Sequence, residues 1–501
     1  MSRPLPGTHA SKLPPAEPSA ENGSRLQPAS PFVSRVSHRR LMSGLATKMV
    51  RSVIAGAMAL GAISVGLLSQ TGTAKAVDVQ RVVSPGGIEA WLVEDRRNPI
   101  IALNLSFLGG AASDPASKEG VANFVAATID EGAGDLDSQA FQRRLEDLSI
   151  SLSFSDGRET FGGSLSTLSE NADQAFELLR LALTEPRFDQ EPVERIRRQI
   201  LAGLTRDLDD PNYWAARGFW AAFYPDHPYG RTTRGTLETV PDITSDDLRA
   251  HMETRLGRDT LKIGVVGDID AETLAGYLDK TFLGLPETTP VKVAVTPVPA
   301  QASGDTFVLR KEIPQSVALF GHGGIARDDP DYYAAYAMNY ILGGGGFASR
   351  LYREVREKKG LAYSVYSYLA PLDSSAVYVG GVATQNSRLG ESLSIIRAEW
   401  ERMRTEGPSA EELADAKTYL TGSFPLRLSS SGQIAGMLVG MQRDDLGIDY
   451  LDRRNQLIEK ITLDDVKRMA QSLLDPDALT FIVVGQPDGV ESTAPAPVSG
   501  F

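Results

Sequence analysis

Hydrophobic and polar residues along this chain follow two patterns, one typical of strands and the other of helices. Short apolar runs such as 100–108 and 316–320 have the length of strands. Longer stretches such as 172–183 and 195–208 carry apolar residues at helical spacing. Groups of strands followed by pairs of helices are typical of helices packed on one face of a largely antiparallel sheet. The pattern therefore predicts an α+β fold.

The same order of elements occurs twice along the chain, at a constant offset of 218 residues. The repeated segments are, in pairs, 243–248 with 461–466, 261–267 with 479–485, and Gly162-Gly163 with Gly380-Gly381. Each copy predicts a helix that begins after a Thr, has acidic residues in its first turn and leads into a buried strand. The sequence therefore predicts two tandem homologous domains, each a mixed, largely antiparallel sheet covered by helices.

Composition places the boundaries of these domains. We expect an N-terminal domain over residues 77–285 and a C-terminal domain over residues 306–487. The linker, residues 286–305, has four prolines and no hydrophobic period, which is typical of an extended connection. Residues 488–501 are expected to form a flexible tail.

Residues 1–76 have the order of charged, apolar and small residues that is typical of a leader with a secretory signal. Lys48 and Arg51 precede an apolar run at 53–68, and small residues follow as far as Ala76. This run of sixteen residues is shorter than the roughly 20 that span a bilayer, which favours cleavage after Ala76. We therefore expect a periplasmic protein, with a membrane-anchored form as the alternative.

Charge and cysteine content narrow the function further. The leader has nine Lys or Arg and two Asp or Glu, a net charge of +7, so the rest of the chain has a net charge near −20. Nucleic acids and anionic membranes need basic surfaces, so neither is an expected partner. No cysteine is present, so stability in an oxidising compartment must come from burial.

Three motifs follow one another in a fixed order. They are residues 120–127, then 209–211 with 226–230, then 342–351 leading into 356–363. Together with the duplication, these motifs resemble the insulinase/pitrilysin family of inverted-motif zinc peptidases over residues 80–487. The resemblance is strongest to the short two-domain bacterial and mitochondrial-processing-peptidase-like subunits. It implies two tandem domains of the metallohydrolase-like, processing-peptidase type.

The resemblance also implies that the zinc motif is lost. Active members carry His-x-x-Glu-His on one helix, where two His bind zinc, the Glu activates water and a Glu from a later helix completes the site. In this sequence the first His falls on Asn123, the general base on Ala126 and the second His on Ala127. The distal ligand falls on Ala202 or Gly203. We therefore expect this chain to bind no zinc by itself.

The remaining histidines lead to the same expectation. After residue 76 they are His227, His251 and His322, and none is paired at helical spacing. No thiolate is available to replace them. His227 lies in a His-Pro-Tyr-Gly segment, where its ring is expected to cap or pack against a turn rather than to do chemistry.

The second domain keeps the positive features of the family. There, an Arg and a Tyr seven residues apart reach the substrate that is bound at zinc, and they match Arg356 and Tyr363. An Arg fork can bind a carbonyl or carboxylate, and a Tyr hydroxyl can donate to a developing oxyanion. The alternative is that Arg356 pairs with Glu354 or Glu357 and that Tyr363 is an ordinary strand aromatic.

A run of four glycines precedes this pair: Gly343, Gly344, Gly345 and Gly346. No Gly-Lys-Ser/Thr follows the run, which excludes a phosphate-binding loop. Glycines permit close approach of the backbone and mobility. The resemblance implies that the run binds substrate, and a structural turn is the alternative.

These observations favour a non-catalytic subunit of a heterodimeric zinc endopeptidase. A homologous partner with an intact His-x-x-Glu-His would hold the zinc, Arg356 and Tyr363 would complete its active site, and unstructured peptides would bind partly by edge-strand pairing. The alternative is a catalytically dead peptide-binding or scaffolding protein of the same fold. A homodimer is the third option, and as an enzyme it would lack an activated nucleophile.

Overall fold

The computed structural model describes residues 77–291 and 295–498. The expected leader and signal peptide, residues 1–76, lie outside the described residues, so that expectation stays a prediction.

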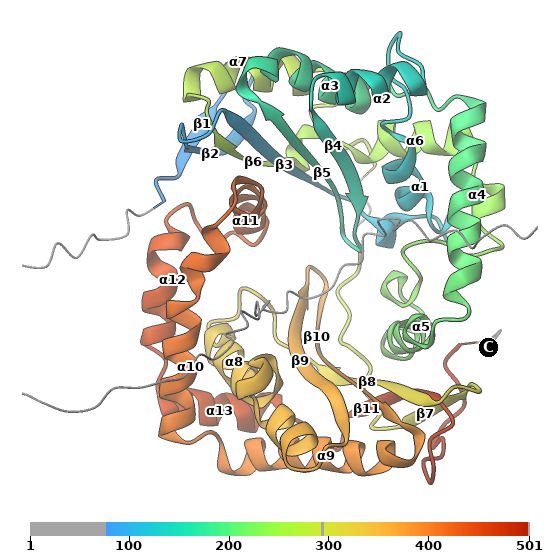
Figure 1. Cartoon of the computed structure of the whole chain (residues 1–501), viewed down its shortest axis with the longest axis vertical. Coiled ribbons are helices and arrows are strands. Elements are labelled where there is room, and N and C mark those ends of the chain that lie inside the picture. Colours follow the sequence, from blue (N-terminus) through green and yellow to red (C-terminus); the bar gives the residue numbers. More distant parts are fainter. Residues whose placement is uncertain (1–76, 292–294, 499–501) are drawn as a thin grey trace, which may run out of the picture. The chain divides into compact units, whose positions relative to one another are not determined.

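The first half of the described chain is built on a mixed sheet of six strands in the order β1-β2-β6-β3-β5-β4 (Figure 1). Its strands are β1 (Gln80–Val83), β2 (Glu89–Glu94), β3 (Ile100–Leu108), β4 (Ser151–Asp156), β5 (Thr160–Leu168) and β6 (Lys262–Gly267). Only β2 and β6 pair in parallel among these strands. Its helices are α1 (Val121–Thr128), α2 (Ser138–Asp147), α3 (Ala172–Thr184), α4 (Gln190–Asp207), α5 (Pro211–Phe223), α6 (Ser245–Arg255) and α7 (Ala271–Phe282).

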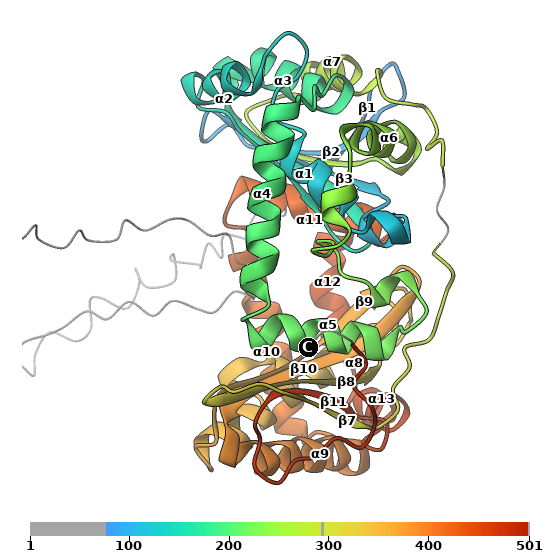
Figure 2. The same cartoon turned by 90° about the vertical axis from the view of Figure 1, so that its right-hand side faces the viewer.

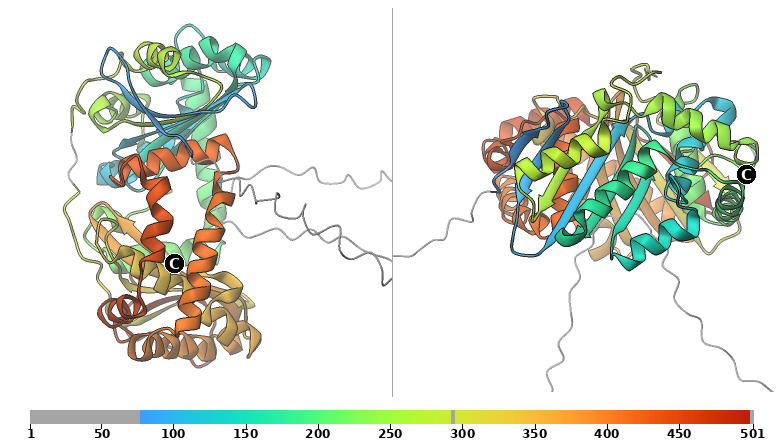
Figure 3. Two further views of the ribbon diagram at one scale, coloured as in Figure 1. Left: turned by 90° about the vertical axis from the view of Figure 1, so that its left-hand side faces the viewer. Right: turned by 90° about the horizontal axis from the view of Figure 1, so that it is seen from above.

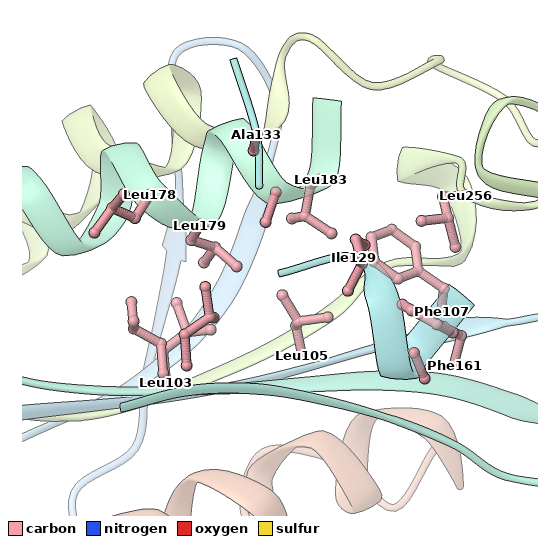
Figure 4. Close-up of a cluster of buried hydrophobic side chains, with 14 of the residues drawn as sticks. Leu103, Leu105, Phe107, Ile129, Ala133, Phe161, Leu178, Leu179, Leu183 and Leu256 are labelled. Atoms are coloured by element: carbon pink, nitrogen blue, oxygen red, sulfur yellow. The ribbon is translucent and has the colours of Figure 1, made fainter. Parts of the chain in front are cut away.

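Alternation of apolar and polar residues determines which face of β3 is buried. Leu103, Leu105 and Phe107 point toward the helices and are at most 3% exposed. Leu179 and Leu183 of α3 belong to the same core, as Figure 4 shows. Burying a Leu or Phe side chain contributes roughly 1.5–3 kcal/mol, so this layer is a main source of stability for the first half.

The second half repeats the arrangement with five strands in the order β7-β11-β8-β10-β9 (Figures 1 and 2). Its strands are β7 (Thr306–Arg310), β8 (Gln315–Gly323), β9 (Ala362–Leu372), β10 (Ser375–Gln385) and β11 (Thr480–Gly485). Its α-helices are α8 (Tyr332–Asn339), α9 (Leu389–Glu406), α10 (Ala410–Gly422), α11 (Ser431–Arg443), α12 (Tyr450–Glu459) and α13 (Leu463–Leu473). Two π-helices, η7 (Tyr340–Gly344) and η9 (Tyr352–Glu357), lie between α8 and β9.

The duplication predicted from the sequence is confirmed by the structure. The order β7-β11-β8-β10-β9 corresponds to β2-β6-β3-β5-β4. The repeated helix is α6 in one half and α13 in the other, and both begin with a capping box, formed by Thr244 with Asp247 and by Thr462 with Asp465. The repeated strands β6 and β11 are almost completely buried. The α+β fold with two helix-covered sheets is therefore as expected.

One feature was not predicted: each half contributes a helix to the sheet of the other half. Helix α5 packs on β8 and β11, and α11 packs on β3 and β6 (Figures 1 and 3). The contacts are close, because a Cβ on Gly264 of β6 would lie 2.3 Å from the carbonyl oxygen of Ala435 in α11. A Cβ on Gly218 of α5 would lie 2.8 Å from Ile482 of β11. The two sheets thus share their cores through exchanged helices.

The linker and the tail both contact the second half. Val298 donates its amide to the carbonyl oxygen of Ser374 at 2.9 Å. In the C-terminal segment, Thr493 donates its amide to the carbonyl oxygen of Thr306 at 2.8 Å, and the flexibility expected for residues 488–501 stays a prediction. Glu491 also pairs with Arg310 at 2.6 Å. The tail therefore covers part of the outer edge of β7, where backbone groups would otherwise be unpaired.

Candidate functional site

Helix α1 carries the three positions at which the zinc motif is expected. It begins after Gly120, whose φ of +94° and close contact with Gly235 require a glycine. Ala126 is buried, and Ala127 packs partly against the core. Asn123 donates its Nδ2 to Oδ1 of Asp156 at 2.7 Å. The helix therefore keeps its packing and ties its one polar side chain at these positions to the end of β4.

The expected position of the distal ligand faces an arginine. A Cβ on Gly203 of α4 would lie 2.9 Å from Nη2 of Arg234. The guanidinium of Arg234 pairs with Asp207. Burial raises the pKa of Asp156, and the Asn123 amide and the charge of Arg234 oppose this rise. A guanidinium has no lone pair for a metal, so the side chains at this site do not fit zinc.

Within residues 77–291 and 295–498, no group of three or more His, Asp or Glu side chains is arranged to hold a metal ion.

Asp114 is a buried carboxyl beside α1 that the sequence did not single out. It is 4% exposed, and its Oδ2 accepts hydrogen bonds from the amides of Gly120 at 3.0 Å and Ala122 at 3.4 Å. Its Oδ1 has no partner among the described residues. Burial raises the pKa of Asp114 to about 7, and the two amide hydrogen bonds oppose this rise. Asp114 therefore holds the start of α1 and titrates near neutral pH.

The structure brings Arg356 and Tyr363 together. Arg356 lies on η9, and its guanidinium carbon is 4.5 Å from the ring centroid of Tyr363. The rings of Tyr352 and Phe347 lie at 4.9 Å and 5.9 Å. Such contacts hold a guanidinium in place through cation–π attraction while leaving its hydrogens available. In the part of the chain that the structure describes, no acceptor or carboxylate binds the Arg356 side chain, and Glu354 pairs with Lys358 instead.

Tyr363 is exposed because β9 has a bulge at this residue. Ala362 pairs with Thr384 and Ser364 pairs with Ala383, which leaves Tyr363 without a partner on β10. The side chain is 80% exposed. Bulges re-aim side chains near functional sites. The bulge therefore turns Tyr363 out of the regular alternation of the strand and presents its hydroxyl to solvent beside Arg356.

The glycine run lies mostly against protein. A Cβ would meet Oγ of Ser367 at 2.3 Å from Gly343, Nδ2 of Asn339 at 2.5 Å from Gly344, and the carbonyl oxygen of Tyr340 at 2.6 Å from Gly345. Only Gly346 of the four faces open space, with a φ of +55°. The first three glycines therefore allow η7 to approach β9 closely, and binding of substrate by the run stays a prediction.

Strand β9 is the outer strand of its sheet and pairs only with β10 in the described chain. It is eleven residues long, and Tyr366 and Tyr368 on it are 40% and 46% exposed. The outer edge of such a strand offers a row of backbone donors and acceptors to an added strand. The Arg356–Tyr363 pair lies at the start of this edge.

The three histidines have structural roles, because each ring caps a turn or is buried in the protein. Nδ1 of His227 accepts from the amide of Tyr229 at 3.2 Å, which agrees with the expected capping of a turn. His322 accepts from Nε1 of Trp400 at 2.9 Å. Burial lowers the pKa values of His251 and His322 to about 4, so both rings are neutral at pH 7.

In the described residues, we find no helix with the length and apolar character needed to cross a bilayer.

Comparisons with known proteins agree with these observations. Residues 90–236 match the family model described as insulinase (peptidase family M16), and residues 242–420 match the model described as peptidase M16 inactive domain. The chain is similar to the non-peptidase homolog YmxG of Helicobacter pylori, with 26% identity over 78% of this chain and 90% of that protein. It is also similar to the beta subunit of the mitochondrial-processing peptidase of Saccharomyces cerevisiae, with 22% identity over 77% of this chain and 86% of that protein.

A solved structure with the same fold is a peptidase M16 inactive domain from Pseudomonas fluorescens. Its TM-score is 0.77 and its identity 28%, over 82% of this chain and 98% of that one. A complex III2 structure from Candida albicans contains a chain with a TM-score of 0.69 at 16% identity, over 82% of this chain and 96% of that one, which shows likeness of fold alone.

Proposed function

Because this chain belongs to the insulinase (M16) family of peptidases, we propose that it is the non-catalytic, substrate-binding subunit of a heterodimeric zinc endopeptidase in the periplasm. Its partner is a homologous subunit with an intact His-x-x-Glu-His, which holds the zinc and the general base. This chain supplies Arg356 and Tyr363 to the shared active site and binds unstructured peptides.

The observation that carries this proposal is the state of the Arg356–Tyr363 pair. Its guanidinium is held between aromatic rings without an acceptor among the described residues, and Tyr363 is turned out by a bulge. Tyr363 is exposed and Arg356 is only partly buried, so the donors of both side chains can reach a bound substrate. Unpaired donors in a fixed position are what a developing oxyanion or a substrate carbonyl needs.

The lost zinc motif explains why a partner is required. Asn123, Ala126 and Ala127 supply no base and no pair of imidazoles, and Arg234 lies at Gly203. Hydrolysis of a peptide bond by this family needs an activated water. The chain therefore contributes binding and charge stabilisation, and the nucleophile comes from the other subunit.

The names of the relatives support the proposal that zinc and substrate-binding groups lie in different subunits. One relative is called a non-peptidase homolog, another is a subunit of a processing peptidase, and a solved neighbour is called an inactive domain. The outer edge of β9 gives an extended peptide a place to pair next to Arg356.

The test is to express this chain and a homologous chain with His-x-x-Glu-His, alone and together, and to assay cleavage of an unstructured peptide. We expect cleavage only with the mixture, and loss of cleavage with a chelator.

Tyr363→Phe in the mixture is expected to lower kcat by roughly 10² to 10³, because one donor to the oxyanion is removed. Tyr419→Phe, at another exposed tyrosine, is the matched control and should leave the rate unchanged. Chelator-sensitive cleavage by this chain alone would refute the proposal.

The second candidate is a catalytically dead peptide-binding or scaffolding protein, which the name of the Helicobacter relative, a non-peptidase homolog, favours. The same experiment separates the two functions. A scaffold forms a complex whose cleavage rate, if there is any, does not respond to Tyr363→Phe or to Arg356→Lys.

A further inference from the structure

A cavity of about 230 Å³ lies between α5 and the second sheet, where β8, β9 and β10 line it. Helix α5 contributes Ala216, Phe219 and Trp220 to its wall, and β9 contributes Tyr366 and Tyr368. None of the residues that line the cavity carries a charge. The cavity thus lies between the exchanged helix of the first half and the sheet of the second half.

Two tyrosines of β9 form the wall of the cavity opposite α5. The rings of Tyr366 and Tyr368 are stacked, with centroids 6.2 Å apart and planes at 15°. A Cβ on Gly381 would lie 2.6 Å from the Tyr366 hydroxyl, so this ring lies across β10 in the space that a glycine leaves. The aromatic surface is therefore fixed in position, although 40% of Tyr366 and 46% of Tyr368 remain exposed.

The register of β9 relates this cavity to the free edge of the strand. Side chains on a strand alternate between the two faces of the sheet, and Tyr366 and Tyr368 share the face that α5 partly covers. A peptide that pairs with the edge of β9 follows the same alternation. Every second side chain of that peptide consequently points to the α5 face, and one of them lies beside the tyrosine pair.

We propose that this cavity binds a single bulky uncharged side chain, aromatic or large aliphatic, from an extended peptide paired with β9. The inference rests on the proposed peptide-binding function and names the class of substrate. The volume suits one side chain and is below the roughly 300–1,000 Å³ of sites for whole small molecules. A charged side chain is excluded, because an ion loses its hydration there without gaining a counter-charge.

The experiment measures binding of labelled peptides to the full chain by fluorescence anisotropy. The probe is an unstructured peptide of Gly, Ser, Thr and Gln with one central Phe, and its partners carry Ser or Asp in place of the Phe. We expect the Phe peptide to bind roughly 10- to 100-fold more tightly than the Ser peptide, and the Asp peptide no better than the Ser peptide. Ala216→Leu narrows the cavity and should abolish the preference for Phe. Tyr368→Ala removes part of an exposed wall and should weaken that preference without unfolding the chain.

The outcomes separate the two proposals. Equal binding of the Phe and Ser peptides, or an unchanged preference in both variants, overturns the cavity as a specificity site while peptide binding stands. No binding of any peptide overturns both the cavity and the proposed function. Tyr419→Ala removes an exposed tyrosine that does not line the cavity and should keep the preference. Thermal unfolding of each variant shows whether it is folded.

Discussion

At the scale of single residues, charged and amide groups surround the positions at which the resemblance places the zinc ligands. Asn123 donates to Asp156, and a Cβ on Gly203 would lie 2.9 Å from Nη2 of Arg234. The absence of His-x-x-Glu-His at residues 123–127 can be read directly from the sequence, and the assignment of these residues to the zinc positions stays a prediction. The nearby arginine could not be predicted, since it is distant from the motif in sequence.

Restoring the ligands alone should therefore fail to restore zinc binding. The variant Asn123→His, Ala126→Glu, Ala127→His and Gly203→Glu is expected to remain free of zinc, because the guanidinium of Arg234 lies beside residue 203 and pairs with the new carboxylate in competition with the metal. Adding Arg234→Ala to these four changes frees that carboxylate. Zinc content per chain, measured by mass spectrometry on dialysed protein, checks this. One zinc per chain in the variant that keeps Arg234 would show that the guanidinium is no obstacle.

Asp114 gives a pH dependence whose sign follows from its burial. Its pKa is about 7 in the folded chain and near its ordinary value of 3.8 in the unfolded chain. Between about pH 4 and pH 7 the folded state therefore holds a proton that the unfolded state has lost, so the free energy of unfolding falls as pH rises. The fall is up to about 4 kcal/mol from this group. Below about pH 4 Asp114 is protonated in both the folded and the unfolded state, and burial of its carboxyl takes nothing from the free energy of unfolding through ionisation.

The variant Asp114→Asn keeps an acceptor for the amides of Gly120 and Ala122 but cannot ionise. Its stability relative to the natural chain should rise from about pH 4 to pH 8, most steeply up to pH 7. Urea unfolding of both chains across this range measures the difference. A difference that stays constant with pH would mean that Asp114 does not hold the proton.

At the scale of elements, the sequence predicted what local patterns determine and missed what neighbouring strands determine. The helices α6 and α13 and the strands after them follow from capping residues and apolar runs that recur at one offset. The bulge at Tyr363 does not, because it depends on the pairing of β9 with β10 rather than on residues near Tyr363. The placement of Arg356 among three rings was likewise visible only in the fold.

The glycine run offers a test at this scale, because its members have different surroundings. Gly343→Ala is expected to lower the free energy of unfolding by about 1–3 kcal/mol, since the new Cβ would lie 2.3 Å from Oγ of Ser367 and 2.9 Å from its backbone nitrogen. Gly346→Ala meets open space and costs only about 1–2 kcal/mol of left-handed strain. Denaturant unfolding compares the two. If the run were merely a flexible connection, both changes would cost equally little.

At the scale of the whole described chain, the exchanged helices set the limit of what the sequence could reveal. Boundaries drawn from composition follow the order of the chain, whereas α5 and α11 pack on sheets to which they are not adjacent in sequence. The apolar faces of both helices predict burial, but amphipathicity does not say against which sheet.

The exchange has a consequence for folding that an ordinary two-domain chain would not have. Residues 77–285 alone would leave β3 and β6 without α11. This would open the hydrophobic cluster that Trp91, Val93 and Val266 share with Ala435 and Leu438 of α11. Exposed apolar surface of this kind leads to association or a loosened core. We therefore expect the isolated first half to bind a hydrophobic dye and to unfold without a sharp transition.

Adding α11 as a peptide of residues 429–445 should restore part of the cooperativity of unfolding, because the peptide supplies the missing helical layer. A control peptide with Leu438→Asp, a residue completely buried in the chain, should not. Cooperative unfolding of the first half without any peptide would show that the exchanged helix is dispensable and that the compositional boundary marks an autonomous domain.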